Sequence, residues 1–122
     1  MADKLIIVMM NSDPANPSEL GAPFFQAAVA AAMEYEVEVL LTGSAGELAR
    51  KGVAEKLSVH EGTKRTVYDY IKEAHEAGVR IKVCTPSLEI WGDDLIPEIE
   101  ETVGGAYLIS EAMDDSTVTF TY

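Results

Sequence analysis

An uninterrupted apolar run near the N-terminus, Lys4–Met10, constrains the fold more than any other part of the sequence. The run has the length of a strand and is bounded by a turn-rich segment, 11–17, that contains Pro14 and Pro17. A strand with apolar residues on both faces is typical of a parallel sheet covered by helices on both sides. We therefore expect a central strand here, followed to Glu19 by a loop at its C-terminal end.

Strand-like and helix-like segments alternate along the rest of the chain. The further predicted strands are Glu36–Thr42, Val79–Cys84 and Thr117–Tyr122. The predicted helices are Ala22–Tyr35, Ala45–Lys51 with an additional turn at Val53–Leu57, Val67–Ala77, a helix from Asp93 or Asp94 to Glu101, and Ala106–Met113. For the helix Val67–Ala77, Thr66 is the expected N-cap and Gly78 the residue that ends it. The last segment is compatible with helix or strand, and we choose helix. This alternation predicts right-handed crossovers in an α/β, single-domain three-layer sandwich over residues 1–122, with a mostly parallel sheet of about five strands.

The balance of charge excludes one broad class of function. The chain of 122 residues carries 21 acidic and 9 basic side chains, a formal net charge of −12. Proteins that bind nucleic acid through its phosphates need a basic surface, so we expect no nucleic-acid partner. Any protein partner is expected to offer a basic surface.

Cysteine and histidine are too scarce for a disulfide or a zinc site. The chain has one cysteine, Cys84, and two histidines, His60 and His75, that are far apart in the sequence. We therefore expect no disulfide, no metal and no cofactor. No apolar stretch is long enough to span a membrane, and Lys4–Met10 is too short for a signal peptide, which predicts a cytoplasmic protein.

The predicted alanine-rich helix lacks a polar stripe. Between Pro23 and Met33 only Gln26 is polar. A helix that is apolar all round is buried on more than one side, so we expect its second side to meet another subunit. The alternative is an exposed helix whose small side chains present little apolar area.

The carboxyl ends of the predicted strands gather the candidate site residues. Functional crevices of open α/β sheets lie at this edge. The residues there are Asn11 and Ser12 after the first strand, Thr42 and Gly43 after the second, and Cys84, Thr85 and Ser87 after the third. Cys84 ends its strand, and a short helix, Leu88–Trp91, is expected to follow, with Thr85 as cap and Pro86 in its first position.

Two interpretations of Cys84 remain open. Backbone N–H groups at the helix start, and Lys82 on the same strand face, favour a reactive thiolate. A free cysteine is also commonly buried as a small apolar residue, and the net negative charge opposes ionisation. Trp91 either shields the thiol from water or, as we favour, anchors a loop to the core.

The remaining polar clusters favour structural roles. His60, Lys64 and Arg65 form a mixed basic loop that either approaches Cys84 or is a solvated turn, and we favour the turn. The carboxylates fit helix capping and solubility better than metal binding or acid–base catalysis: Asp93, Asp94, Glu98, Glu100 and Glu101. Glycine-rich nucleotide-binding motifs are missing, and two histidines away from strand ends argue against a Ser-His-Asp triad.

The third strand and its surroundings resemble the DsrE/DsrF-like family. The resemblance rests on Val79–Ser87, Gly92–Ile96 and Gly104–Ala106, and the strands Lys4–Met10 and Ser116–Phe120 fit the same pattern. It implies a small α/β sandwich with flavodoxin-like layering and assembly into homotrimers or homohexamers. Several members act in sulfur relay, which implies that Cys84 accepts sulfur as a persulfide. Some members have further cysteines, but this chain has none, so a two-thiol exchange within one subunit is excluded.

The leading hypothesis is an intracellular sulfur carrier, or sulfurtransferase-like protein, that holds sulfane sulfur on Cys84. The alternative is a non-catalytic oligomeric module that binds a small ligand or a partner, with Cys84 as a packing residue. A peroxide-reacting thiol enzyme is disfavoured because the chain has no second, resolving cysteine. Whether the protein is an enzyme, and which donor and acceptor it uses, are left open by the sequence.

Overall fold

Five strands form one sheet in the order β4-β3-β2-β1-β5. The structure is a computed structural model that describes residues 3–60 and 62–122, so Met1, Ala2 and Glu61 of the predicted domain lie outside the described residues. The strands are β1 (Lys4–Met9), β2 (Glu36–Leu41), β3 (Arg80–Cys84), β4 (Ile99–Val103) and β5 (Thr117–Thr121). All four neighbouring pairs are parallel. The predicted central strand is therefore β1, between β2 and β5.

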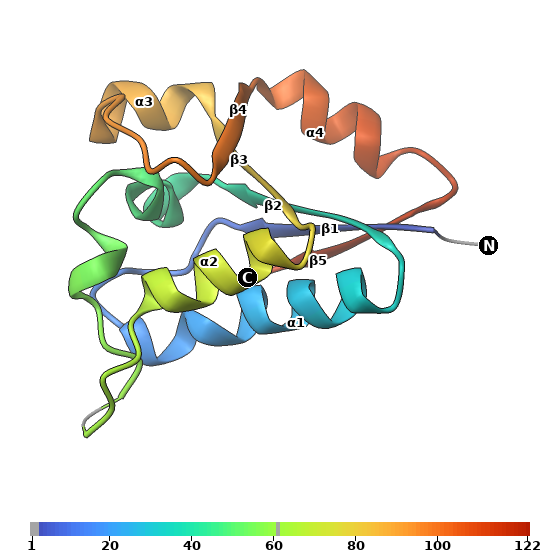
Figure 1. Ribbon diagram of the computed structural model, residues 1–122. Helices are drawn as coiled ribbons and strands as arrows, with labels where there is room; N and C mark the ends of the chain where they lie inside the picture. The colour runs from blue at the N-terminus through green and yellow to red at the C-terminus, as the bar shows by residue number, and fades with distance from the viewer. Residues whose placement is uncertain (1–2, 61) are drawn as a thin grey trace.

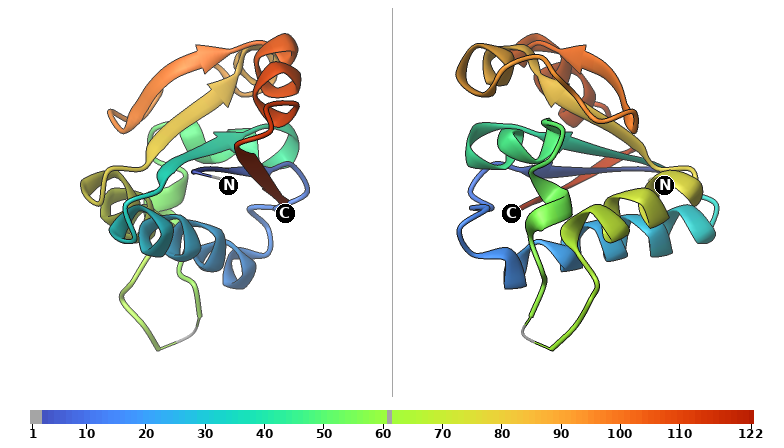
Figure 2. Two further views of the ribbon diagram at one scale, coloured as in Figure 1. Left: turned by 90° about the vertical axis from the view of Figure 1, so that its right-hand side faces the viewer. Right: turned by 60° about the vertical axis from the view of Figure 1, so that its left-hand side comes forward.

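Helices cover both faces of this sheet. On one face α1 (Gly21–Ala32) and α2 (Val67–Glu76) lie side by side, and on the other lie α3 (Thr85–Trp91) and α4 (Gly105–Ala112) (Figures 1 and 2). Three short 3-10 helices complete the chain: η1 (Pro17–Glu19), η2 (Gly43–Ala49) and η3 (Ala54–Lys56). The three-layer α/β sandwich with a parallel sheet is confirmed, although the predicted helix Ala45–Lys51 is the 3-10 helix η2.

The apolar core lies between the sheet and the α1/α2 layer. Alternate residues of each strand point into it because successive side chains of a strand face opposite sides. Fully buried members include Ile7, Met9, Val39, Leu41, Ile81 and Val83 of the strands and Phe24, Val67 and Ile71 of the helices. Each such side chain contributes about 1.5–3 kcal/mol when it is removed from water. This core fixes the strand ends that carry the candidate site.

Sequence signals at both ends of α2 are confirmed. The Thr66 hydroxyl accepts a hydrogen bond from the Asp69 N–H at 3.3 Å, and the Asp69 carboxylate accepts one from the Thr66 N–H at 2.9 Å. This reciprocal pair satisfies N–H groups that the helix itself leaves unpaired. At the other end Gly78 has a φ of +103°, a conformation that glycine adopts without steric cost.

The helix predicted from Asp93 or Asp94 to Glu101 is wrong, because this segment is an irregular loop with a turn before it forms the edge strand β4. Pro97 disfavours a helical conformation at the residue before it, Ile96. The Ile96 N–H instead donates to the last carbonyl of η2 at 2.8 Å. Pairing with β3 and η2 thus overrides the helix preference of the glutamates. The ambiguous segment Ala106–Met113 is helical, as α4.

A charge network centred on the buried Glu38 and Lys82, rather than an apolar layer, joins α4 to the sheet. Its members are Lys4 of β1, Glu38 of β2, Lys82 of β3, Glu101 of β4, and Tyr107 and Glu111 of α4. The Lys82 Nζ lies 2.5 Å from the Glu38 Oε1 and 2.7 Å from the Glu101 Oε1. The Tyr107 hydroxyl accepts from Lys82 at 2.7 Å and donates to Glu38. Buried charges are tolerated because each is paired.

Across residues 3–60 and 62–122, none of the helices combines the length and the apolar character needed to cross a bilayer.

Candidate functional site

Cys84 lies where β3 ends and α3 begins, with its sulfur between two hydroxyl groups. It is partly buried and not in a disulfide. Its Sγ is 2.9 Å from the Oγ1 of Thr42, which follows the neighbouring strand β2, and 2.9 Å from the Oγ of Ser87 in the first turn of α3. Either partner can donate while the sulfur is a thiol. Both hydroxyls donate once it is a thiolate, which accepts only.

These contacts favour the ionised form of the sulfur. Burial by itself raises the pKa of the Cys84 thiol, but the hydrogen bonds from the Ser87 and Thr42 hydroxyls outweigh it and lower the pKa below its ordinary value. The backbone N–H groups of Ser87 and Gly43 act in the same direction. Hydrogen bonds to a charged form stabilise that form. The thiol is therefore more acidic than a free cysteine, despite the acidic surface of the protein.

Lys82 does not supply the positive charge that its position on the strand suggested. Its side chain is 4% exposed, and its amine is paired with Glu38 and Glu101. Burial lowers the pKa of Lys82, and the hydrogen bonds with Glu101 and Glu38 raise it by more, so the amine stays charged but neutralised by its carboxylates. Hydrogen-bond donors, rather than a cationic neighbour, account for the acidity of Cys84.

Two glycines of η2, Gly43 and Gly46, occupy positions where a side chain would collide with neighbouring residues. Gly43 has a φ of +55°, and a Cβ there would lie 2.7 Å from the Met10 carbonyl oxygen. A Cβ on Gly46 would lie 2.8 Å from the Ser87 Cβ and 3.2 Å from the Trp91 Cδ1. Gly46 was missed by sequence reasoning, because only the packing of η2 on α3 reveals the close approach.

Trp91 anchors the start of η2, in agreement with the interpretation that we favoured. Its indole N–H donates to the Gly43 carbonyl at 3.2 Å. Trp91 ends α3 and Cys84 precedes the first residue of the same helix. Both ends of α3 therefore meet the segment that begins at Thr42.

Thr85 has a different role from the predicted cap. α3 begins at Thr85, so Cys84 itself holds the N-cap position, and Pro86 is the second helical residue rather than the first. The Thr85 hydroxyl donates to the Val103 carbonyl at 3.2 Å and so links α3 to β4. The helix thus starts earlier than the predicted Leu88–Trp91.

Asn11 and Ser12 lie at the same edge of the sheet as Cys84 but follow β1, which β2 separates from β3. Ser12 is buried and Asn11 is exposed, and the Asn11 N–H donates to the Tyr122 carbonyl at 3.0 Å. The structure therefore brings Thr42, Gly43 and Ser87 to Cys84, with Trp91 behind Gly43. Asn11 and Ser12 follow β1, which is one strand further from Cys84 than β2 is.

The basic loop lies on the other side of the sheet. Arg65 forms a bidentate ion pair with Glu73 of α2, in which its two terminal guanidinium nitrogens lie 2.9 and 2.7 Å from the two carboxylate oxygens. The guanidinium also stacks on the Tyr70 ring. His60 lines a hollow with Tyr70 beside α1. Cys84 instead shares the sheet face of Lys82, because the two residues are two positions apart in β3. This face is the one covered by α4, since Lys82 contacts Tyr107 of that helix.

The acidic residues after α3 do not cap a helix, contrary to the prediction for Asp93 and Asp94. The Asp94 carboxylate pairs with the Lys51 amine at 3.3 Å on the surface, and Glu98 accepts from the Tyr68 hydroxyl at 3.0 Å. Across the described ranges, no three or more His, Cys, Asp or Glu side chains gather in a way that could hold a metal ion.

Comparison with known proteins agrees with this fold. The crystal structure of the YchN protein from E. coli superposes with a TM-score of 0.71 at 17% sequence identity, over 98% of this chain and 100% of that one. No protein of curated function matches the sequence. The model of the DsrE/DsrF-like family matches residues 4–121, which is nearly the whole chain. The protein is therefore a member of the DsrE/DsrF-like family.

Proposed function

We propose that this protein carries sulfane sulfur as a persulfide on Cys84 and passes it to a partner thiol. The observation that supports this most is the placement of the Cys84 sulfur 2.9 Å from both the Thr42 and the Ser87 hydroxyl. These donors stabilise the thiolate, which is the nucleophilic form of cysteine. Membership of the DsrE/DsrF-like family makes a role in sulfur relay the natural context.

The transfer consists of two displacements at sulfur. The Cys84 thiolate attacks the outer sulfur of a donor persulfide, R–S–SH, and a new S–S bond forms as the donor bond breaks. The products are Cys84–S–SH and the donor thiolate R–S⁻. A partner thiolate then attacks the outer sulfur of Cys84–S–SH, takes it with its proton, and releases the Cys84 thiolate. Each step balances without an external oxidant, and its rate depends on thiolate fraction and access.

Charge favours a protein partner over a small anionic donor. The molecule has a net charge of −12, so it repels anions such as thiosulfate and attracts a basic protein surface. We therefore propose that donor and acceptor are cysteines on basic proteins. A carrier that depends on a free thiol suits a reducing compartment, and we propose the cytoplasm.

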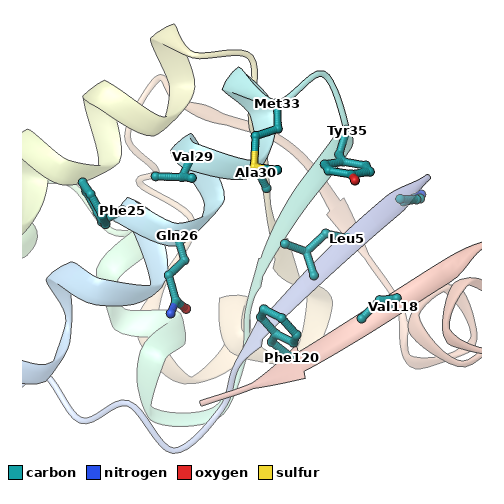
Figure 3. A pocket seen from close by; sticks show the side chains of 10 residues that line it. Leu5, Phe25, Gln26, Val29, Ala30, Met33, Tyr35, Val118 and Phe120 are labelled. Carbon is teal, nitrogen blue, oxygen red and sulfur yellow. The ribbon is translucent and has the colours of Figure 1, made fainter. Parts of the chain in front are cut away.

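A second copy of the chain is the partner proposed for the apolar groove between α1 and β5. The groove has a volume of about 460 Å³, and Phe25, Val29, Met33, Tyr35, Val118 and Phe120 line it (Figure 3). Phe25 is 60% exposed and Met33 is 61% exposed. Given the 150–250 Å² of a buried aromatic side chain, the groove residues expose roughly 500 Å², and an equal area on the contacting surface of the second copy gives the ~1,000 Å² of a specific interface. We propose a homo-oligomer, a trimer or hexamer, that uses this groove.

Mass spectrometry tests the carrier function. The native protein is incubated with a persulfidated donor protein, and separately with polysulfide, and is then weighed intact and as peptides. We expect the mass of one sulfur atom on the Cys84 peptide, no gain in Cys84→Ser, and loss of the adduct when a thiol acceptor is added. A native protein that stays unmodified with every donor would overturn the proposal. It would favour the binding module in which Cys84 only packs.

A further inference from the structure

Gly43 is held from two sides by opposite ends of α3. Its N–H helps to stabilise the Cys84 sulfur at the start of this helix. Its carbonyl accepts the indole N–H of Trp91, the last residue of the helix, at 3.2 Å. The two groups belong to successive peptide units, so the indole fixes the orientation of Gly43 and, with it, the N–H that faces the sulfur.

The same indole packs where Ser87 meets η2. Gly46 lacks a side chain at this point, and the Trp91 Cδ1 and the Ser87 Cβ both lie within 3.2 Å of the position that a Cβ would occupy. Ser87 is buried, and its hydroxyl is one of the two that contact Cys84. Trp91 is thus close to two of the residues that supply donors to the sulfur.

We propose that Trp91 is a positioning residue for Cys84: through the Gly43 carbonyl and the packing at Gly46, its indole holds the hydrogen-bond donors against the sulfur. Trp91 acts through these residues and not by contact with the reacting atoms. The inference rests on the proposed reactivity of Cys84. The positioning role of Trp91 is tested through the ionisation of the Cys84 thiol, whereas the carrier function is tested through sulfur transfer. One proposal can therefore be contradicted without the other.

The first test compares the pH profile of Cys84 alkylation by iodoacetamide in the intact protein and in Trp91→Phe. This variant keeps an aromatic ring but removes the N–H donor. We expect its profile to move to higher pH and the rate at neutral pH to fall roughly threefold, the effect of one weakened hydrogen bond to a charged group. The rate in unfolded protein should not change.

Tyr68→Phe is the matched control. It also removes one donor from a helical aromatic residue, because the Tyr68 hydroxyl donates to Glu98 at 3.0 Å. Glu98 precedes the first residue of β4, whereas Cys84 is the last residue of the parallel strand β3. The two residues therefore lie at opposite ends of the strands. We expect its alkylation profile to match that of the unsubstituted protein. Superimposable profiles for Trp91→Phe and the unsubstituted protein, or an equal shift in Tyr68→Phe, would overturn the inference.

A second measurement needs no change at Trp91 and decides the question if Trp91→Phe does not fold. Trp91 is the only tryptophan among five tyrosines, so emission excited selectively at the red edge of tryptophan absorption reports on the surroundings of Trp91. We expect a change in emission with the same pH midpoint as Cys84 alkylation, and no such change in Cys84→Ser. An emission that passes through this midpoint unchanged would overturn the inference.

Discussion

At the scale of single residues, the acidity of Cys84 is set by neutral donors. Lys82 is two positions away on the same strand, yet Glu38 and Glu101 already neutralise it. The hydroxyls of Thr42 and Ser87 contact the sulfur directly and come from two different elements. A site built this way needs its strand and helix ends fixed relative to one another.

Removal of either hydroxyl should make Cys84 less reactive. In Thr42→Val or Ser87→Ala we expect the thiol pKa to rise and alkylation at neutral pH to slow about three- to tenfold, because the thiolate loses one donor. Stopped-flow alkylation across pH measures the shift. Thr119→Val removes a hydroxyl from exposed β5 and serves as control. Rates unchanged in both site variants would show that these contacts do not stabilise the thiolate.

Sequence reasoning located this site only in part. Cys84 was predicted at a strand end because Val79–Cys84 alternates and Thr85 and Pro86 follow it. Contact between Cys84 and Thr42 depends on strand order, which places β2 beside β3. The role of Gly46 depends on how η2 packs on α3, and no local pattern encodes that contact.

At the scale of elements, local signals and long-range pairing compete. The capping residues of α2 and the apolar run of β1 were predicted correctly, because their patterns act within one element. β4 was missed because its glutamates favour a helix locally, whereas pairing with β3 makes it a strand. Its outer position explains the charge, since acidic residues protect an exposed strand edge.

The capping pair of α2 gives a prediction at this scale. Thr66→Ala leaves the Asp69 N–H without its hydroxyl partner, so we expect the free energy of unfolding to fall by about 1 kcal/mol. Urea denaturation measures the change. Thr66→Ser keeps the hydroxyl and should stay within a few tenths of a kcal/mol of the unsubstituted protein. An equal loss in both variants would contradict a role for the capping hydroxyl.

At the scale of the whole molecule, one buried ion network and one apolar groove stand out. The network links β1 to β4 with α4, so its carboxylate Glu38 couples distant parts of the chain. The groove leaves apolar side chains of α1 and β5 half exposed. The alanine-rich helix α1 had suggested a subunit contact from the sequence, but the groove depends on β5 lying beside β1.

Glu38 makes stability sensitive to acid. Burial raises the pKa of Glu38, but hydrogen bonds from Lys4, Lys82 and Tyr107 outweigh it and lower the pKa to about 2. A carboxylate with a depressed pKa stabilises the fold above its ordinary pKa, near 4.5, and loses this effect as the pH falls toward 2. We expect urea denaturation to show this loss in the unsubstituted protein and a flatter acid limb in Glu38→Gln.

At neutral pH, Glu38→Gln should also lower the free energy of unfolding by about 3 kcal/mol, because two buried amines lose their shared partner. Glu73→Gln is the control. Glu73 pairs with Arg65 at 2.7 Å on the surface, where such a pair contributes at most about 1 kcal/mol. Equal losses in the two variants would contradict the importance of the network.

The groove predicts the state of association. Size-exclusion chromatography with light scattering should find an oligomer, and Phe25→Glu combined with Met33→Glu should shift it toward the monomer, because carboxylates enter an apolar interface. The same pair of substitutions at two exposed residues, Ile109→Glu in α4 with Met113→Glu at its C-cap, is the control. An oligomer that survives the groove substitutions would assign the contact to another surface.

The most direct measurement on the central claim is the pH midpoint of Cys84 alkylation in the native protein, set against the same protein unfolded in urea. If neighbouring donors hold the sulfur accessible and anionic, the native midpoint lies at lower pH and the native thiol reacts readily at neutral pH. A native midpoint at or above the unfolded one, or a thiol that reacts only after unfolding, would contradict the account.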